Sequence, residues 1–285
     1  MDQRSLETAL ADLELPAIRY FASVDSTNDE ARRWFYEGAA DRSLVVAEAQ
    51  TAGRGRAGRR WVTLPGVSLA FSLVCSPQRY ESLALARLTA SGGLAVRDAL
   101  RKKYNLAVQL KWPNDVLING SKVAGVLVEN HWLGEALETV ILGIGINVAP
   151  GSVSEQALPG EELSYPATCV ENELGQPVER VELLHAVLRE FFAWQPRLSS
   201  PDLMREWEAS LAFRGEWVQI LHVMSYDKDG LLTSLEPRSG QSEKGKVMGL
   251  TQDGALKLLT KTGEVVIAPV GEVRLLPPNK EKVYV

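Results

Sequence analysis

The segment Gln50–Trp61 reads QTAGRGRAGRRW and is the most distinctive stretch of the sequence. Its centre, Gly53–Arg60, contains four arginines and three glycines. Glycine lets a backbone approach a ligand closely, and the arginine guanidinium offers a planar fork of donors to carboxylate or phosphate oxygens. The composition therefore predicts an anion-binding loop, with a solvated basic loop as the alternative.

The same loop satisfies the G-x-G-x-x-G pattern of dinucleotide-binding folds through Gly53, Gly55 and Gly58. That pattern requires a helix directly after the glycines, and the sequence WVTLPG at Trp61–Gly66 would break one. No convincing acidic residue follows about 20 positions later. The pattern is therefore a weak indication here, and we do not predict a dinucleotide-binding fold.

Helical patterns lie on both sides of this loop. Thr27 and Glu30 have the spacing of a capping box, and Gly38 would end the helix that starts there. A long helical pattern covers 81–104 and contains the pair Gly92-Gly93, which indicates close packing or a bend. Further helices are expected at 181–194 and 202–211.

Strands are expected at 43–49, 67–74, 116–118, 123–129 and 139–148. The Asn119-Gly120 turn joins two of them in a hairpin, because asparagine and glycine tolerate the positive φ of a tight turn. Consecutive strands between helices indicate an α+β fold, with a mixed β-sheet and flanking helices.

The sequence pattern changes after residue 213, where short strand patterns alternate with turn dipeptides. These patterns lie at 216–222, 230–235, 246–251, 256–259 and 265–268. We therefore predict two domains, a larger one over 1–213 and a small β-barrel over 214–285.

Composition excludes several classes of protein. The 285 residues carry a net charge of −5, which argues against a protein that works mainly by wrapping nucleic acid. Cys75 and Cys169 are the only two cysteines; they are too few for a disulfide scaffold and are expected to be inert buried thiols. No apolar run approaches the ~20 residues that cross a bilayer, and the first residues lack a secretory signal. A cytoplasmic protein without membrane contact is expected.

Three further motifs contain candidate binding residues. Lys122 begins an otherwise apolar strand, where its ammonium would stabilise developing negative charge better than in water; a lysine that snorkels from the strand end is the alternative. Asn147 lies in the glycine-containing stretch Gly143–Val148, where the glycines suggest close approach by a ligand or another chain segment; packing against a helix is the alternative. Hydroxyls in Ser26–Asn28 can bind a small polar ligand, although helix capping also explains this motif.

Taken together and in this order, the motifs resemble the biotin–protein ligase family. The resemblance rests on S-T-N at 26–28, Q-x-A-G-R-G-R-x-G-R-x-W at 50–61, K-W-P-N-D at 111–115, K-x-A-G-x-L-V-E at 122–129 and G-I-G-I-N-V at 143–148. It continues through Pro166-Ala167-Thr168 and covers nearly the whole chain. The fold it implies is a class II synthetase-like biotin/lipoate ligase catalytic domain followed by a small SH3-like β-barrel.

The resemblance implies a reaction in two steps that uses ATP with Mg²⁺. The biotin carboxylate attacks the α-phosphate of ATP and yields biotinoyl-5′-AMP and pyrophosphate. A lysine of a biotin carboxyl carrier protein domain then attacks this mixed anhydride and releases AMP. Fixed cations lower the cost of bringing two anions together, and a loop that folds over the intermediate shields it from water.

Residue by residue, the resemblance implies three groups. The biotin site would contain Ser26, Thr27, Asn28, Gln50, Arg54, Gly55, Arg56 and Lys122. The nucleotide site would contain Lys111, Asn114, Asp115 and Asn147, with no magnesium ligand assigned. The catalytic residues would be Lys122, Arg56 and Lys111. No covalent nucleophile is needed, because the two substrates react with each other.

Two alternatives stay open at this point. One is a lipoate or octanoate ligase of the same architecture, and the other is a non-catalytic biotin sensor. The Ser-Thr-Asn motif begins at residue 26, so we expect no N-terminal DNA-binding domain and no binding of DNA. A homodimer is possible in such a family, but no sequence feature identifies its interface.

Overall fold

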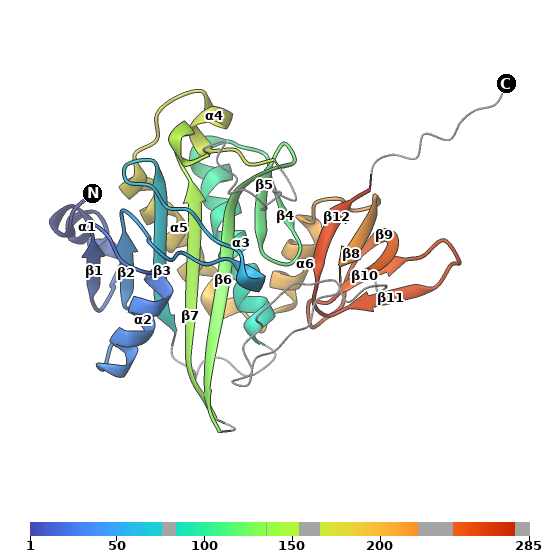
Figure 1. Cartoon of the computed structure of the whole chain (residues 1–285), viewed down its shortest axis with the longest axis horizontal. Helices are drawn as coiled ribbons and strands as arrows, with labels where there is room; N and C mark the ends of the chain where they lie inside the picture. Colours follow the sequence, from blue (N-terminus) through green and yellow to red (C-terminus); the bar gives the residue numbers. More distant parts are fainter. Residues whose placement is uncertain (76–83, 135, 154–165, 222–241, 277–285) are drawn as a thin grey trace.

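The computed structural model describes residues 1–75, 84–134, 136–153, 166–221 and 242–276 (Figure 1). Its helices are α1 (Gln3–Ala9), α2 (Thr27–Tyr36), α3 (Ala84–Tyr104), α4 (Val170–Leu174), α5 (Arg180–Trp194) and α6 (Pro201–Ala209). Its 3-10 turns are η1 (Ala11–Leu13), η2 (Arg56–Gly58), η4 (Pro150–Ser152) and η5 (Gln195–Arg197).

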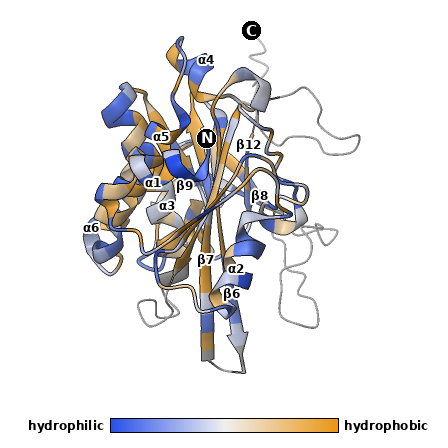
Figure 2. Ribbon diagram, turned by 90° about the vertical axis from the view of Figure 1, so that its left-hand side faces the viewer, coloured by the Kyte–Doolittle hydropathy of each residue, from blue (hydrophilic) through white to orange (hydrophobic). Residues whose placement is uncertain are grey.

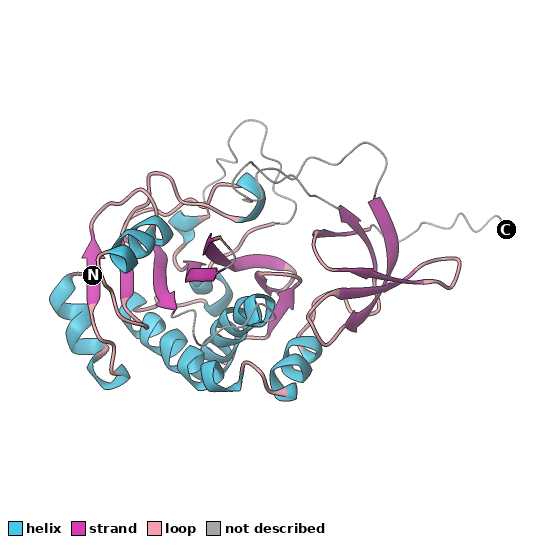
Figure 3. Cartoon of the chain, turned by 90° about the horizontal axis from the view of Figure 1, so that it is seen from below, coloured by secondary structure: helices cyan, strands magenta, loops and turns pink. Residues whose placement is uncertain are grey.

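The strands form two sheets. The larger sheet contains β1 (Ile18–Phe21), β2 (Leu44–Ala47), β3 (Ser68–Cys75), β4 (Val108–Lys111), β5 (Asp115–Ile118), β6 (Ser121–Leu133) and β7 (Ala136–Asn147). The smaller sheet contains β8 (Trp217–Leu221), β9 (Ser242–Leu250), β10 (Leu256–Leu259), β11 (Val265–Ala268) and β12 (Glu272–Leu275). Figure 3 shows the smaller sheet at one end of the molecule.

The larger sheet is mixed, as the sequence predicts. Its strand order is β1-β2-β3-β7-β6-β5-β4. The β1–β2 pair is parallel, whereas the remaining neighbours run antiparallel. The predicted hairpin is present, since β5 and β6 join through Asn119 and Gly120 with φ values of 50° and 76°.

The two faces of this sheet differ in what covers them. Successive strand residues point to opposite faces, so in β7 Leu142 and Ile144 share one face and Gly143 and Gly145 share the other. Leu142 and Ile144 lie under α3, where they border Gly92. The face with Gly143 and Gly145 instead receives α2 and the segment that follows β2 (Figure 1).

Helix α3 approaches the sheet most closely at its two glycines. A β-carbon on Gly92 would lie 3.0 Å from Val126 Cγ1, whereas one on Gly93 would lie 3.4 Å from Leu110 Cδ2, an ordinary contact. The prediction that this pair marks close packing is therefore confirmed at Gly92.

This difference gives a matched pair of substitutions. Gly92→Ala is expected to destabilise the protein by about 1–2 kcal/mol, because overpacking displaces Val126. Gly93→Ala is expected to be neutral or to stabilise the protein by up to about 1 kcal/mol, because alanine is the better helix former. Urea unfolding of both variants measures the difference, and equal values would contradict the close approach at Gly92.

Helix α2 is short and polar, and Figure 2 shows it mostly blue beside the orange strands of the sheet. It is anchored by a small buried cluster that contains Ala31 together with Val45, Val74 and Ile141 from three strands. The helix ends at Tyr36, and Gly38 follows with a φ of 95°, as the sequence predicts.

The smaller sheet is antiparallel, with the order β11-β10-β9-β8-β12. In the described residues no ladder joins β11 to β12, so the sheet is open and the expectation of a closed barrel is corrected. The predicted strands at 256–259 and 265–268 match β10 and β11, and β12 was not predicted. The strand predicted at 230–235 lies outside the described residues.

The two sheets share one apolar core. The cluster that contains Val116 and Leu142 of the larger sheet also contains Val218, Val247 and Leu258 of the smaller one. Polar contacts join them as well, since Trp112 Nε1 donates to the carbonyl of Gly254 at 2.9 Å. Both cysteines are buried and form no disulfide, as expected. Among the helices that the structure describes, none is both long and apolar enough to cross a membrane.

Candidate active site

The candidate site is built on three glycines of the central strands, Gly125, Gly143 and Gly145, which we call the glycine floor. Gly125 of β6 pairs with Gly145 of β7, so the two lie side by side. A β-carbon on Gly145 would lie only 2.7 Å from Trp61 Cζ2, and one on Gly143 would lie 3.0 Å from Asn28 Cγ. Only glycine therefore allows these two side chains to lie directly on the sheet.

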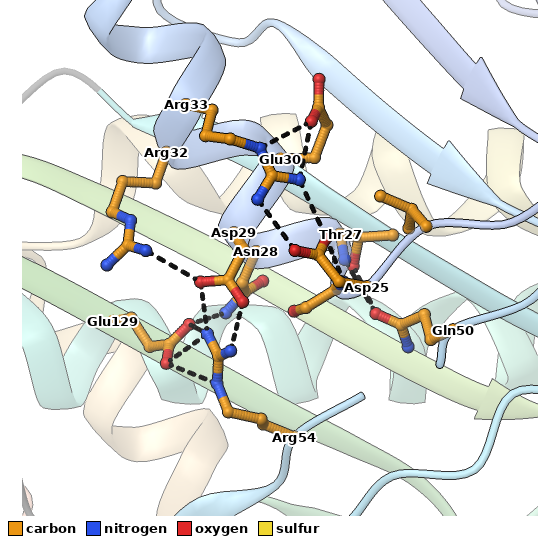
Figure 4. Close-up of polar contacts among 12 residues, drawn as sticks. Asp25, Thr27, Asn28, Asp29, Glu30, Arg32, Arg33, Gln50, Arg54 and Glu129 are labelled. Atoms are coloured by element: carbon orange, nitrogen blue, oxygen red, sulfur yellow. Dashed lines mark hydrogen bonds and ion pairs between the residues drawn. The ribbon is translucent and has the colours of Figure 1, made fainter. Parts of the chain in front are cut away.

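Above the floor, the start of α2 contributes a group of polar side chains. Ser26, Thr27 and Asn28 are 2%, 4% and 5% exposed, so they face the interior and not solvent. The Gln50 carbonyl Oε1 accepts hydrogen bonds from Thr27 N at 2.8 Å and Thr27 Oγ1 at 3.1 Å. Ser72 Oγ lies 2.6 Å from Asn28 Oδ1 and 2.8 Å from Thr27 Oγ1. We call Thr27, Asn28, Gln50 and Ser72 the polar cluster; Figure 4 labels the first three.

The predicted capping box is wrong at this helix start. Ser26 is the N-cap and makes no side-chain capping bond, while the Thr27 hydroxyl bonds to Gln50 instead. Glu30 accepts from Arg33 at 3.0 Å. The hydroxyl of Thr27 therefore bonds to Gln50 and not to the backbone of its own helix, which a local capping rule does not anticipate.

The second group, which we call the cation cluster, surrounds a buried aspartate. Asp115 Oδ1 lies 2.6 Å from Lys122 Nζ, and Asp115 Oδ2 lies 3.3 Å from Lys111 Nζ. The Lys111 side chain is 3% exposed and the Lys122 side chain 28%, so Lys122 is the one that reaches solvent. The Lys122 ammonium also lies 5.4 Å above the ring of Trp61.

The charges of this cluster act on one another. Burial alone would raise the pKa of Asp115, but the positive charges of Lys122 and Lys111 outweigh it and hold that pKa at about 2. Burial lowers the pKa of Lys111, and the Asp115 charge opposes this shift. Burial likewise lowers the pKa of Arg56, against the charges of Asp115 and Glu272. Arg56 is thus within electrostatic range of the same aspartate.

The arginine loop, Gly53–Arg60, crosses the site as a tight turn and contains no α-helix. This geometry confirms that the G-x-G-x-x-G match is not a dinucleotide-binding turn. Gly55 N donates to the carbonyl of Arg59 at 2.7 Å. A β-carbon on Gly55 would meet Arg59 Cβ at 3.6 Å, so the fold itself does not require glycine there.

Two arginines of the loop contact carboxylates on other elements. Arg54 lies between Asp29 of α2 and Glu129 of β6 (Figure 4). Arg59 pairs with Glu272 of β12, so the smaller sheet also contacts the loop. The loop is therefore held between both sheets.

The structure does not bring every predicted residue to these groups. Asn114 Nδ2 donates to the carbonyl of Val126 at 2.8 Å, and Asn147 Nδ2 donates to the carbonyl of Thr168 at 3.1 Å. Both amides hold backbone segments together in this structure. Their assignment to the nucleotide site remains a prediction.

Several residues of the site were not singled out from the sequence. Ser72 interrupts the apolar strand β3, and this polar position was the available signal. Trp61 and Glu129 stand inside quoted motifs, but neither received a role. No sequence pattern marks Asp29 or Glu272, because their partners Arg54 and Arg59 lie far from them in the sequence.

The chain is similar to several known proteins. Residues 20–147 match the family model for the biotin/lipoate A/B protein ligase family. The chain is 36% identical over 258 residues to the biotin–[acetyl-CoA-carboxylase] ligase of Paracoccus denitrificans, covering 88% of this chain and 98% of that protein. It is 29% identical to the Mycobacterium tuberculosis biotin–[acetyl-CoA-carboxylase] ligase, over 96% and 95% of the two chains.

A solved structure resembles the whole fold. It is the biotin protein ligase from Aquifex aeolicus in complex with biotin and ATP. The superposition has a TM-score of 0.72 at 29% identity, and it covers 92% of this chain and 100% of that one.

Proposed function

The chain belongs to the biotin/lipoate A/B protein ligase family, and we infer that within this family it acts as a biotin–protein ligase. It adenylates biotin with ATP and transfers biotin to an acceptor protein. The observation that carries this inference is the placement of a buried polar cluster beside a cation cluster on one face of the sheet. Such a pair of sites suits a substrate with a polar ring system at one end and a carboxylate at the other.

The polar cluster supports recognition of the ring system. Thr27 and Asn28 are buried, and their side chains are fixed by Gln50 and Ser72. Preorganised donors and acceptors bind a matching polar ligand without reorganising first. The biotin ring would therefore lie against Thr27, Asn28 and Gln50, with Ser26 at the base of this group.

The cation cluster supports the chemistry at the carboxylate. In the first step a carboxylate oxygen of biotin bonds to the α-phosphorus of ATP, and the bond to pyrophosphate breaks. Negative charge collects on the phosphoryl oxygens, where Lys122, Lys111 and Arg56 would stabilise it. In the second step the acceptor amine bonds to the acyl carbon, loses a proton, and AMP leaves.

Magnesium would accompany ATP in this proposal. Mg²⁺ is usually held by one or two carboxylates together with substrate phosphates, and Asp115 is the carboxylate of the cation cluster. Its two lysine partners limit its capacity for a metal, so the phosphates would supply most of the ligands. In the described part of the chain, no group of three or more His, Cys, Asp or Glu residues is arranged to hold a metal ion.

The acceptor would be a lysine of a biotin carboxyl carrier domain. The names of the relatives as acetyl-CoA-carboxylase ligases support an acceptor of this kind. A net charge of −5 supports a ligase that does not bind DNA. Two buried cysteines that form no disulfide support a cytoplasmic location.

A homodimer is the remaining proposal about partners. Strand β6 runs to Leu133, but β5 pairs with it only as far as Gly125. Val126 still bonds towards β5, since its N donates to the carbonyl of Asn114 at 3.0 Å and its own carbonyl accepts from Asn114 Nδ2. The edge of β6 to which a second strand can pair therefore begins beyond Val126. Sedimentation analysis across a range of protein concentrations tests this proposal.

The two alternatives are weaker. Lipoate has no ureido ring, so a set of buried polar side chains around Gln50 would have no partner in a lipoate ligase. A sensor of biotin alone would not require Lys111, Lys122 and Arg56 near one carboxylate.

One assay separates the three functions. The protein is incubated with ATP, labelled biotin or lipoate, and a biotin carrier domain. We expect biotin-dependent release of pyrophosphate and label on the carrier lysine. Labelling with lipoate alone would favour the lipoate ligase, and binding of biotin without pyrophosphate release would favour the sensor.

A further inference from the structure

The arginine loop contacts the rest of the protein through a pair of carboxylates that face Arg54. Arg54 Nη2 lies 2.9 Å from Asp29 Oδ1 and 3.1 Å from Glu129 Oε1, and Nη1 bonds to Asp29 Oδ2. The Nε of Arg54 also donates to Glu129 Oε1 at 3.3 Å. We call Asp29 and Glu129 the carboxylate clamp.

The clamp compensates the charge of Arg54 in full. Two carboxylates face one guanidinium, although Arg32 shares Asp29 at 3.1 Å. The side chains of Asp29 and Glu129 are only 15% and 20% exposed, so solvent screens these pairs less than typical surface pairs. Hydrogen bonding to Asp29 raises the pKa of Arg54 above its ordinary value. An arginine held in this way is an anchor and not an available ligand for a substrate anion.

The clamp is also joined to the polar cluster. Glu129 Oε2 accepts a hydrogen bond from Asn28 Nδ2 at 2.6 Å, and Asn28 Oδ1 lies 2.6 Å from Ser72 Oγ. Asp29 follows Asn28 directly in the first turn of α2. The position of Arg54, and of Arg56 two residues later, is thus tied to the side chains proposed to bind the biotin ring.

We propose that Asp29 and Glu129 are positioning residues that hold Arg54 and thereby keep the arginine loop in place across the glycine floor. This proposal rests on the proposed function and adds to it. It assigns Arg54 to the structure of the loop and leaves Arg56 as the arginine that meets the substrate. Neither carboxylate has to touch biotin or ATP.

The proposal predicts a selective kinetic effect. In Asp29→Asn the bidentate pair is lost, so ligand binding has to order the loop. Holding a loop in its bound shape contributes to affinity mainly by removing that ordering cost. We therefore expect the KM for biotin to rise by about tenfold and biotinoyl-AMP to dissociate faster by a similar factor, while kcat changes by less than about threefold.

Asp25→Asn is the matched control. Asp25 stands four positions earlier, and its carboxylate pairs with Arg33 at 2.8 Å and accepts from Ser26 N at 2.7 Å. In the described part of the chain this carboxylate contacts no arginine of the loop. We expect Asp25→Asn to leave the KM for biotin near the wild-type value. Asp29→Glu keeps the charge and should restore at least half of the lost affinity. A KM in Asp29→Asn equal to that in Asp25→Asn, or a fall in kcat without a change in KM, would overturn the proposal.

A second measurement does not depend on the reaction. Trypsin cuts after arginine, and the loop contains Arg54, Arg56, Arg59 and Arg60. Asp29→Asn and Glu129→Gln should be cut within this loop several times faster than Asp25→Asn. If the wild-type protein released no pyrophosphate, the proposed function would fail. The cleavage rates would still show whether Asp29 and Glu129 hold the arginine loop in place. Equal cleavage in all three variants would reject it.

Discussion

Lys122→Ala is expected to lower kcat/KM for biotin adenylation by roughly 30- to 1000-fold. This range corresponds to about 2–4 kcal/mol, the scale found when one preorganised electrostatic donor is removed from an active site. Lys122 combines the features that such a donor needs. Its ammonium is fixed by Asp115 at 2.6 Å and by the Trp61 ring at 5.4 Å, yet its side chain remains 28% exposed.

Lys103→Ala is the control for this variant. Lys103 lies on α3 and pairs with Glu182 at 2.8 Å on the surface, remote from the glycine floor. Steady-state pyrophosphate release with biotin as the varied substrate measures both variants. If Lys122→Ala retained its rate within twofold, the ammonium would not face the developing charge. Restoration of part of the rate in Lys122→Arg would show that the charge itself is required.

Asp115→Asn is expected to destabilise the fold by about 3 kcal/mol, because it removes the carboxylate that separates Lys111 and Lys122 and leaves two like charges close together. Lys111 is almost fully buried, so water cannot replace the lost charge there. Urea unfolding at neutral pH measures the loss. Asp202→Asn, which removes an exposed partner of Arg197, should change stability little by comparison.

The same aspartate gives a pH dependence with a definite sign. Its pKa is held at about 2 in the folded protein and is 3.8 without these interactions. The stabilisation is therefore complete above about pH 4 and is lost as pH falls towards 2, by about 2 kcal/mol in all. The difference in unfolding free energy between the wild type and Asp115→Asn should shrink over that interval. A constant difference would show that the two lysines do not depress this pKa.

The sequence was sufficient where a local pattern determines structure. The Asn119-Gly120 turn fixes the β5–β6 hairpin, and the Gly143–Val148 pattern identifies β7 as a strand that other groups approach. Local patterns failed at Thr27, because its hydroxyl has a stronger partner in Gln50 than in its own helix. Gln50 reaches Thr27 because the tertiary fold brings the two segments together, and a capping rule considers only neighbouring residues of one helix.

The partners of the arginine loop illustrate the same limit. The run of arginines predicts an anion-binding loop, but in the structure Arg54 and Arg59 already bind carboxylates of the protein. Asp29 and Glu272 come from opposite ends of the chain, so no spacing rule connects them with the loop. The run of charge in the sequence thus draws attention to this segment, whereas the partners of its individual arginines depend on the tertiary fold.

The shared apolar core has a consequence for how the protein melts. Trp207 and Leu203 of α6 belong to the same cluster as Val218 and Leu258, so one apolar core extends across both sides of residue 213. Heating should produce one calorimetric peak whose van't Hoff and calorimetric enthalpies agree. Removing the segment after residue 213 would expose the apolar side chains around Trp207. The remaining fragment would then aggregate and would not fold as a smaller independent enzyme.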